Sequence, residues 1–560
     1  MKKWMVVFLV LIGMRGMGQV PTWEWARDGI CNNSGGGGAD VYGIASDNIG
    51  NVYLTGYFTD TLSFGSYTLI NHSYLGNVFT VKYDSSGNLI WAVCANDSAR
   101  VRPYGIATDV FGNVFITGYF STPTVTFGSF TLINNHSLYD IFIVKYDSNG
   151  NVIWANGIDG NGYDHGYAIA TDALGNCYVT GTFDSPSLTF GTHTINNGGT
   201  TNIFLVKYDA LGNAIWAQRA GGNYIDGGYG VSSDSDGNIL LTGYFRSAVS
   251  YFGTDSLIRS GNSYNFFIAK YDSTGNEIWS RGANEGIGNF DCIGASIISD
   301  ANANIYVTGE FNSPTIIFSS DTLTRLGNLA AFNCFVVKYD SAGNSLWAKN
   351  SLGNGQSIIC DMASNVYVAG SIPNTYTTIT FDTLTLNEPS GSDTLDPMFV
   401  VKYNSSGHAI YGLLLPSGGD DYSGVALGPS NSLYIGGDFF RINPYIFGND
   451  SLILTGAETP FVAKLGYPII EGIPIVSPQP TISLFPNPFS TSTTLLINGE
   501  IKENSHLYIY NLLGEEVKTI PIINQKEITI NRDNLADGMY FYKIIGNNNE
   551  SIATGKMIVE

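Results

Sequence analysis

The sequence predicts an all-β protein: a seven-bladed β-propeller with four-stranded blades, followed by a small Ig-like β-sandwich. Three observations lead to this prediction. The composition is rich in turns, with 67 Gly among 560 residues and only 13% charged residues. A tryptophan motif returns at a nearly constant spacing, and apolar residues within each unit alternate with the period of two that is typical of strands.

Charge and composition exclude several classes of partner. The chain carries 26 Lys and Arg against 47 Asp and Glu, a formal net charge of −21. This field repels phosphate backbones and anionic lipid surfaces, so we expect no nucleic-acid partner. With 44% hydrophobic residues, the chain is too apolar for disorder and long enough for a large core.

The first 18 residues are typical of a signal peptide. Lys2 and Lys3 precede an apolar run that reaches Met14. No later window approaches the roughly 20 apolar residues of a membrane span, so we expect an exported protein without a transmembrane segment. The six cysteines follow no metal-binding or thiol-redox spacing and leave their pairing open. We expect buried small hydrophobic side chains, as at Cys177.

The repeat is marked by an aromatic residue and by a lysine. The aromatic positions are Trp91, Trp154, Trp216, Trp279, Trp347 and Tyr411, with steps of 63, 62, 63, 68 and 64 residues. The lysines are Lys82, Lys145, Lys207, Lys270, Lys338, Lys402 and Lys464. Side chains repeated in every unit are expected to build the scaffold, whereas a binding site breaks the symmetry.

Each unit is expected to contain four strands, which in the first unit are residues 42–46, 51–58, 78–83 and 88–92. Asp-x-x-Gly-Asn segments fit tight turns in which Asp caps the turn and Gly takes positive φ. An insert carrying Phe-Gly fits a small extra hairpin. Because both faces of each sheet are apolar, each sheet needs a neighbour on both sides, and radial closure over residues 19–466 provides it.

The seventh unit breaks off at Lys464 without its fourth strand. The segment from Trp23 to Ala26 matches the missing element, and Trp25 stands 66 residues before Trp91. We therefore expect the N-terminal segment to complete the last sheet.

These repeats resemble the SBBP-type β-propeller repeats of bacterial surface proteins over residues 22–464. Seven copies in register make the resemblance specific for the fold. It implies little about function, because a propeller scaffold hosts many activities.

After a Pro-rich linker at residues 467–483, a second pattern of short strands covers residues 484–560. It resembles the type A C-terminal sorting domain of the Bacteroidetes type IX secretion system. The resemblance implies contact with that secretion machinery and release or attachment at the outer-membrane surface, and an ordinary adhesive sandwich domain is the alternative. The motif positions are Pro486, Asn487, Pro488, Gly514, Gly538, Tyr540 and Lys556.

No catalytic signature or cofactor motif is present, and we expect neither catalytic nor metal-binding residues. His165 follows Asp164, a pair that is more often solvated than catalytic. Asp234 and Asp236 occupy a segment similar to part of a calcium loop, but the distal Glu is missing. Calcium binding there remains an open alternative.

Acids occur shortly before the expected innermost strand in five units. If the propeller closes, they gather at one channel mouth and can hold a cation, a sugar or a basic peptide; the alternative is solvated loop acids on an acidic surface. The acids are Asp40, Asp164, Asp226, Asp291 and Asp421, with aromatic companions Tyr42, Tyr163, Tyr224, Phe290 and Tyr422.

Two function classes follow from these patterns. We favour a monomeric secreted or surface-displayed binding and adhesion protein with a glycan or protein ligand. The alternative is a carbohydrate-active enzyme, a glycosidase or lyase, with acids at the channel mouth.

Overall fold

The computed structural model shows an all-β chain that divides into two compact units, residues 1–468 and 469–560. The structure describes residues 21–32, 38–71, 75–95, 100–261, 263–284, 290–319, 321–328, 331–373, 376, 378–387, 396–415, 424–439, 444–454, 458–466, 481–498, 505–511, 516–522, 527–545 and 551–560. The expected signal peptide and residues 467–480 of the expected linker lie outside these ranges.

Seven four-stranded antiparallel sheets, here numbered 1 to 7, occur in the described part of the N-terminal unit. The innermost strands of sheets 1 to 7 are β3 (Ala39–Ser46), β9 (Val101–Thr108), β15 (His165–Thr171), β21 (Asp226–Ser233), β27 (Cys292–Ser299), β33 (Asn354–Cys360) and β39 (Gly424–Leu427). The second strands are β4 (Val52–Phe58), β10 (Val114–Phe120), β16 (Cys177–Phe183), β22 (Ile239–Phe245), β28 (Ile305–Phe311), β34 (Val366–Ser371) and β40 (Leu433–Phe439).

The third and fourth strands complete each sheet. The third strands are β7 (Asn77–Tyr83), β13 (Asp140–Tyr146), β19 (Asn202–Tyr208), β25 (Asn265–Tyr271), β31 (Asn333–Tyr339), β37 (Met398–Tyr403) and β43 (Thr459–Gly466). The fourth strands are β8 (Leu89–Cys94), β14 (Val152–Ile158), β20 (Ala214–Ala220), β26 (Glu277–Gly282), β32 (Ser345–Leu352), β38 (Ala409–Leu415) and β1 (Thr22–Asp28). The observed bounds of sheet 1 lie within three residues of the expected ones.

The sheets follow one another around a ring. Each innermost strand contacts the next one, and β39 contacts both β33 and β3, so the ring closes. Most side chains of the second and third strands are buried between sheets, which explains their continuous apolar sequence. Hydroxyls also link the sheets: Thr108 Oγ1 donates to the Ser46 carbonyl at 2.8 Å, and Thr171 Oγ1 donates to the Thr108 carbonyl at 2.7 Å. The arrangement is propeller-like.

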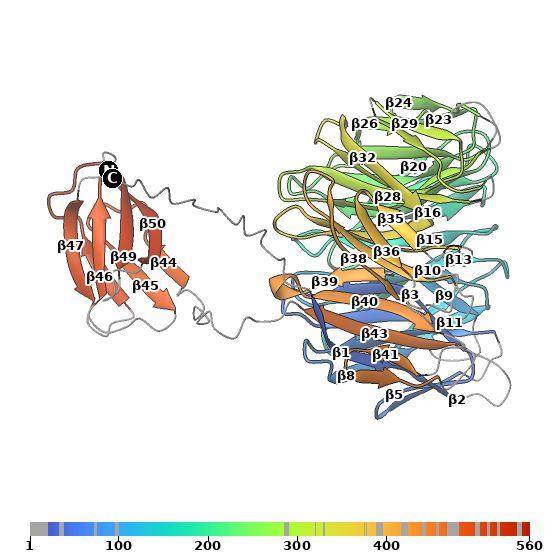
Figure 1. Cartoon of the computed structure of the whole chain (residues 1–560), viewed down its shortest axis with the longest axis horizontal. Helices are drawn as coiled ribbons and strands as arrows, with labels where there is room; N and C mark the ends of the chain where they lie inside the picture. Colours follow the sequence, from blue (N-terminus) through green and yellow to red (C-terminus); the bar gives the residue numbers. More distant parts are fainter. Residues whose placement is uncertain are drawn as a thin grey trace, which may run out of the picture. The chain divides into compact units, whose positions relative to one another are not determined.

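Sheet 7 is completed by the N-terminal strand, as the sequence predicts. β1 pairs antiparallel with β43, and Trp25 stands opposite Lys464, just as Trp91 stands opposite Lys82 in sheet 1. Figure 1 shows the blue β1 beside β43, which comes from the far end of the same unit. Two distant chain segments therefore form one sheet.

The inserts form small hairpins outside the sheets, five with Phe-Gly and those of sheets 5 and 6 with Phe318-Ser319 and Phe381-Asp382. The phenylalanines of these hairpins are buried, as Phe190 and Phe252 show. The hairpins are β5 (Thr61–Phe64) with β6 (Tyr67–Ile70), joined by β2 (Ile30–Asn32); β11 (Thr124–Phe127) with β12 (Phe130–Ile133); β17 (Ser187–Phe190) with β18 (His193–Asn196); β23 (Val249–Phe252) with β24 (Asp255–Ile258); β29 (Thr315–Phe318) with β30 (Asp321–Thr324); β35 (Thr378–Phe381) with β36 (Leu384–Asn387); and β41 (Tyr445–Phe447) with β42 (Asp450–Leu452). A single 3₁₀ turn, η1 (Pro429–Asn431), precedes β40 in the described chain.

The repeated side chains join neighbouring sheets. Trp91 Nε1 and Lys82 Nζ of sheet 1 both donate to the carbonyl of Ser148 in sheet 2, at 3.1 and 3.0 Å. Asp47 Oδ1 accepts backbone N–H bonds from Ile49 and Asn51 and so caps its turn. The expected structural role of the repeat residues is confirmed by these bonds.

The C-terminal unit has two sheets around one apolar core. β44 (Thr481–Phe485), β45 (Ser492–Asn498) and β48 (Glu527–Asn531) form one sheet. β46 (Ser505–Tyr510), β47 (Glu516–Ile522), β49 (Gly538–Ile545) and β50 (Ser551–Val559) form the other. Leu495 and Ile530 of the first sheet share a cluster with Leu507, Ile509 and Tyr542 of the second.

Candidate ligand-binding site

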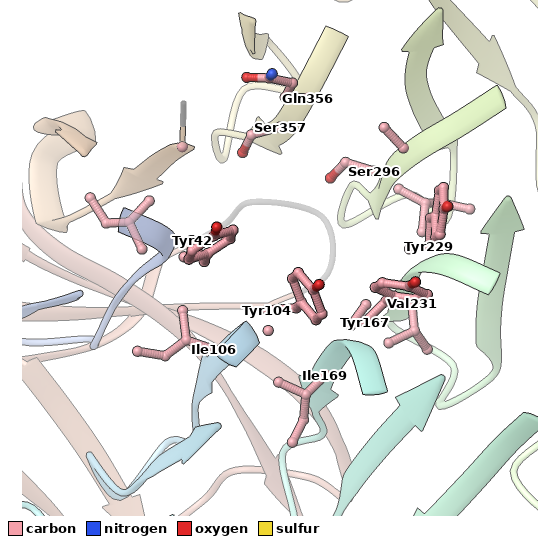
Figure 2. A pocket seen from close by; sticks show the side chains of 18 of the residues that line it. Tyr42, Tyr104, Ile106, Tyr167, Ile169, Tyr229, Val231, Ser296, Gln356 and Ser357 are labelled. Atoms are coloured by element: carbon pink, nitrogen blue, oxygen red, sulfur yellow. The ribbon is translucent and has the colours of Figure 1, made fainter. Parts of the chain in front are cut away.

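A pocket of about 430 Å³ lies at the centre of the N-terminal unit, between the innermost strands. Its walls come from all seven sheets, from Val41 of β3 to Gly424 of β39. Figure 2 shows its labelled side chains. Since no single sheet builds it, the pocket depends on closure of the ring.

A β-bulge in each innermost strand of sheets 1 to 6 shapes this pocket. The bulge residue stands between two register positions and does not pair with the second strand. These residues are Tyr42, Tyr104, Tyr167, Tyr229, Ala295 and Gln356, and all six line the pocket. The same backbone feature therefore presents four tyrosines and then two other residues.

We call Tyr42, Tyr104, Tyr167 and Tyr229 the tyrosine arc. Adjacent rings contact each other, with centroid separations of 5.6 Å between Tyr42 and Tyr104, 5.0 Å between Tyr104 and Tyr167, and 4.8 Å between Tyr167 and Tyr229. The rings are tilted or edge-on to each other. The arc is a connected aromatic surface on one side of the pocket.

The opposite wall is small and polar. It includes Ser296, Gln356 and Ser357, which Figure 2 shows across the pocket from the arc. Among the described residues that line the pocket, none is acidic, basic, a histidine or a cysteine. Its chemistry consists of aromatic faces, hydroxyl groups and one amide.

Two of the predicted ligand acids are buried and hydrogen-bonded by neighbouring loops. Asp226 Oδ2 accepts hydrogen bonds from Gly222 N at 2.6 Å and from Ser247 Oγ at 2.7 Å, and its Oδ1 accepts from Arg246 N at 2.9 Å. Asp164 accepts from Ser185 Oγ, and burial raises the pKa of this carboxyl to about 6. Both carboxyls organise the loops before the innermost strands.

The remaining predicted acids, Asp40 and Asp291, have other surroundings. Asp40 is buried, and burial together with Glu458 raises the pKa of its carboxyl to about 9. Asp291 is half-buried and accepts a hydrogen bond from Ser263 Oγ. None of the four described acids lines the pocket. Asp421 and Tyr422 lie outside the described residues.

Two of the predicted aromatic companions are largely exposed. Tyr163 and Tyr224 are 49% and 41% exposed. The ring of Tyr163 contacts Tyr139 at 4.9 Å. His165 stacks on Tyr167 at 5.5 Å, and burial lowers the pKa of its imidazole to about 4. His165 is therefore neutral near pH 7.

The segment that resembles a calcium loop forms an ordinary repeat turn. Asp234 accepts N–H bonds from Asp236 and Asn238, and its carboxylate pairs with Lys270 Nζ at 2.8 Å. Burial opposes the charged form, but hydrogen bonds from Lys270 and Asn238 lower the pKa of Asp234 below its usual value. In the described chain, no group of three or more His, Cys, Asp or Glu is arranged to hold a metal ion.

A second hollow of about 410 Å³ lies at the C-terminal ends of the innermost strands. Asp109, Asp172, Asp234 and Asp300 line it. These are turn-capping acids, and three of them pair with a lysine of the repeat. This end of the channel is built from scaffold residues.

The sorting-motif residues hold the end of the C-terminal chain. Asn487 Oδ1 accepts a hydrogen bond from Ile558 N at 2.8 Å, and Thr493 Oγ1 donates to the Pro486 carbonyl at 2.6 Å. Tyr540 donates its hydroxyl to the Ala536 carbonyl at 3.0 Å. Pro488 precedes Phe489 of the core, Gly538 opens β49 at φ 149°, and Lys556 lies exposed on β50. Gly514 lies outside the described residues.

Comparisons with known proteins give three findings. An uncharacterized WD repeat-containing protein of Acanthamoeba polyphaga mimivirus is 29% identical over 387 residues, which cover 56% of this chain and 28% of the relative. This chain thus spans less than a third of that relative's length. Sqt1 from Chaetomium thermophilum has a TM-score of 0.38 at 9% identity, covering 81% of this chain and all of Sqt1. PorZ, a surface component of the type IX secretion system of Porphyromonas gingivalis, has a TM-score of 0.20 at 11% identity, covering 93% of this chain and 81% of PorZ.

The family comparison identifies the C-terminal unit. Residues 483–560 match the secretion system C-terminal sorting domain. No helix among the described residues is long and apolar enough to cross a membrane. The chain therefore ends in a type IX sorting domain, and the protein is secreted or held at the cell surface, outside the cell.

Proposed function

We propose that this protein is a secreted or surface-held glycan-binding protein whose central pocket receives sugar rings. In this proposal the seven sheets are the blades of a seven-bladed propeller of the SBBP type, the C-terminal unit is an Ig-like sandwich, and the exported protein is a monomer. A signal peptide and the type IX machinery carry it out of the cell.

The tyrosine arc is the observation that carries the proposal. Aromatic faces are electron-rich, and the C–H groups of a sugar ring can pack against them. The phenolic hydroxyls and the facing Ser296, Gln356 and Ser357 supply donors and acceptors for sugar hydroxyls. A largely apolar pocket with a few polar groups is typical of small-ligand sites.

The same lining supports binding without catalysis. Glycoside hydrolysis uses two carboxyl groups on either side of the scissile bond. The described pocket lining contributes none, and Asp164 and Asp226 are engaged by loop N–H and hydroxyl groups. Our proposal requires no cofactor.

Calorimetry on the full-length secreted protein, with glycans first selected on an array, tests the proposal. Tyr167→Ala should weaken binding about 30-fold, the loss that corresponds to about 2 kcal/mol at an interface hot spot. Tyr251→Ala is the matched control, because Tyr251 is 51% exposed on an outer hairpin. Equal affinities for Tyr167→Ala and the parent would contradict the proposed site, and cleavage of a bound glycan would contradict the proposed lack of catalysis.

A further inference from the structure

The aromatic surface extends beyond the pocket at both ends of the tyrosine arc. At one end, Tyr229 contacts Tyr244 at 5.3 Å, and Tyr244 contacts Tyr264 at 4.7 Å. At the other end, Tyr42 contacts Tyr57 at 5.9 Å. A continuous series of tyrosine rings thus crosses sheets 1 to 4.

An arginine covers each end of this series. The Arg102 guanidinium lies 5.4 Å from the Tyr42 ring centroid and 4.6 Å from that of Tyr57. The Arg246 guanidinium lies 5.2 Å from the ring of Tyr224 and 5.4 Å from that of Tyr264. Both side chains are half-buried, so their charges are held in place at the edge of the aromatic surface.

Neither guanidinium is neutralised by a carboxylate. In the described chain, no ion pair involves Arg102 or Arg246, whereas Arg27 pairs with Asp450 at 3.4 Å. The buried Nε of Arg246 has no hydrogen-bond partner. The protein has a net charge of −21, but these two guanidiniums without ion pairs place positive charge near the pocket.

The nearest predicted acids form no ion pair with these guanidiniums in the described structure. Asp226 accepts the Arg246 backbone N–H, but its carboxylate makes no ion pair with the Arg246 side chain in the described structure. Asp40 lies near Tyr57, and burial together with the neighbouring Glu458 raises the pKa of its carboxyl. Because arginines already cover the end rings, a cationic ligand would meet repulsion there.

The position of Tyr57 in the second strand distinguishes the two halves of the ring. Tyr119 and Tyr244 occupy the equivalent positions of sheets 2 and 4, whereas Glu310 and Asp438 occupy those of sheets 5 and 7. At this position the aromatic rings lie in sheets 1, 2 and 4 and the acids in sheets 5 and 7, while Thr182 and Ser371 occupy it in sheets 3 and 6. This asymmetry gives the pocket a side that suits a negative group.

We infer that the glycan bound by the tyrosine arc is acidic, with uronic acid sugars whose carboxylates are bound by Arg102 and Arg246. The inference rests on the proposed glycan-binding function and specifies its ligand class. A guanidinium presents two parallel N–H donors that match a carboxylate, while tyrosine faces receive the sugar rings. The separation of the two arginines along the arc favours an oligosaccharide over a single sugar.

The test compares acidic polymers with neutral copies of the same polymers. The full-length protein is titrated with polygalacturonate and with alginate, and each titration is repeated with the carboxyl-reduced polymer. We expect at least 10-fold tighter binding of one acidic polymer than of its reduced copy, and a loss of this preference as NaCl is raised. Competition with free galacturonate reports whether a single sugar is sufficient.

The double variant Arg102→Gln, Arg246→Gln assigns the effect to the two arginines. It should lose about 10-fold or more in affinity for the acidic polymer and change little for the reduced one. Arg281→Gln is the matched control, because the Arg281 guanidinium also lies over an aromatic ring, Trp279, at 5.4 Å, but outside the arc. Thermal unfolding of each variant shows that the fold is retained.

The outcomes separate the inference from the proposed function. Equal binding of acidic and reduced polymers, or an unchanged preference in the double variant, overturns the acidic ligand class, while a loss on Tyr167→Ala still supports glycan binding. If neither polymer binds in either form, the acidic ligand class is overturned, and the proposed glycan binding is then decided by the array-selected glycans and Tyr167→Ala.

Discussion

Closure of the ring by the N-terminal strand should make Trp25 one of the most important side chains for stability. Trp25 is 5% exposed and its ring lies 5.9 Å from Tyr434 and 6.4 Å from Tyr83, between sheets 7 and 1. Its Nε1 donates to the Ser85 carbonyl at 3.1 Å. We predict that Trp25→Ala opens the junction at which the two ends of the repeat meet.

The magnitude follows from the packing. Truncation of a buried tryptophan to alanine costs about 3–5 kcal/mol of unfolding free energy. Lys464 Nζ also donates to the Ser85 carbonyl, at 3.0 Å, so this acceptor is not left unpaired and adds no further cost. On the same strand, Trp23 is half-buried and meets Phe447 edge-on at 4.8 Å. Trp23→Ala should therefore cost only about 1 kcal/mol.

Urea unfolding followed by far-ultraviolet circular dichroism measures both variants, and hydrogen exchange locates the effect. Amides of β43, such as those of Val462 and Ala463, should exchange faster in Trp25→Ala, while those of β13 should keep their protection. A loss below about 1 kcal/mol, or one no larger than that of Trp23→Ala, would refute closure through Trp25.

Four further predictions test other parts of the molecule. Lys270→Met leaves Asp234 buried without its ion pair and should lower the free energy of urea unfolding by about 3–5 kcal/mol. Lys349→Met is the control, because the pair of Lys349 with Asp382 is more exposed and its loss should cost below about 1 kcal/mol. Asp226→Asn places an amide against Gly222 N and Ser247 Oγ and should cost about 2–3 kcal/mol, and a neutral result would mean that these hydrogen bonds are dispensable. Burial lowers the pKa of His165 to about 4, so its contribution to stability is complete above about pH 6.5 and is lost as the pH falls towards 4. His165→Gln should therefore flatten the dependence of the unfolding free energy on pH between these values. An unchanged pH dependence would contradict the lowered pKa. Removal of residues 483–560 should abolish appearance of the protein outside the cell on immunoblots, and undiminished export would show that the sorting domain is not required.

The fold was predictable because the repeat residues make the same contacts in successive sheets. The tryptophan and lysine of one unit reach the third-to-fourth-strand turn of the next unit, as Trp154 and Lys145 both do at the Ala210 carbonyl. Such contacts require a constant spacing, and a constant spacing is visible in a single sequence. The same logic located β1, since Trp25 stands where the seventh sheet lacks its tryptophan.

The site was only partly predictable. Asp164 and Asp291 directly precede their innermost strands, whereas Asp40 and Asp226 lie within the first two residues of theirs. The orientation of these acids depends on loops such as the one that directs Gly222 N and Ser247 Oγ at Asp226. Loop hydrogen bonds of this kind have no sequence period. Of the tyrosine arc, only Tyr42 was singled out, although a Tyr followed by Gly or Ala recurs at Tyr104, Tyr167 and Tyr229 with steps of 62, 63 and 62 residues.

The β-bulge explains why this tyrosine signal was overlooked. In a regular strand the side chain of Tyr42 would point to one face of sheet 1, and the sequence pattern would assign it to the core between two sheets. The bulge inserts one unpaired residue, so Tyr42 leaves the ladder and lines the pocket. The backbone irregularity is the same in six sheets, but the side chain changes to Ala295 and Gln356 in sheets 5 and 6. Because the backbone fixes the position and leaves the residue free, the side chain at the bulge can vary without cost to the sheets, and under the proposed function this variation would set ligand specificity.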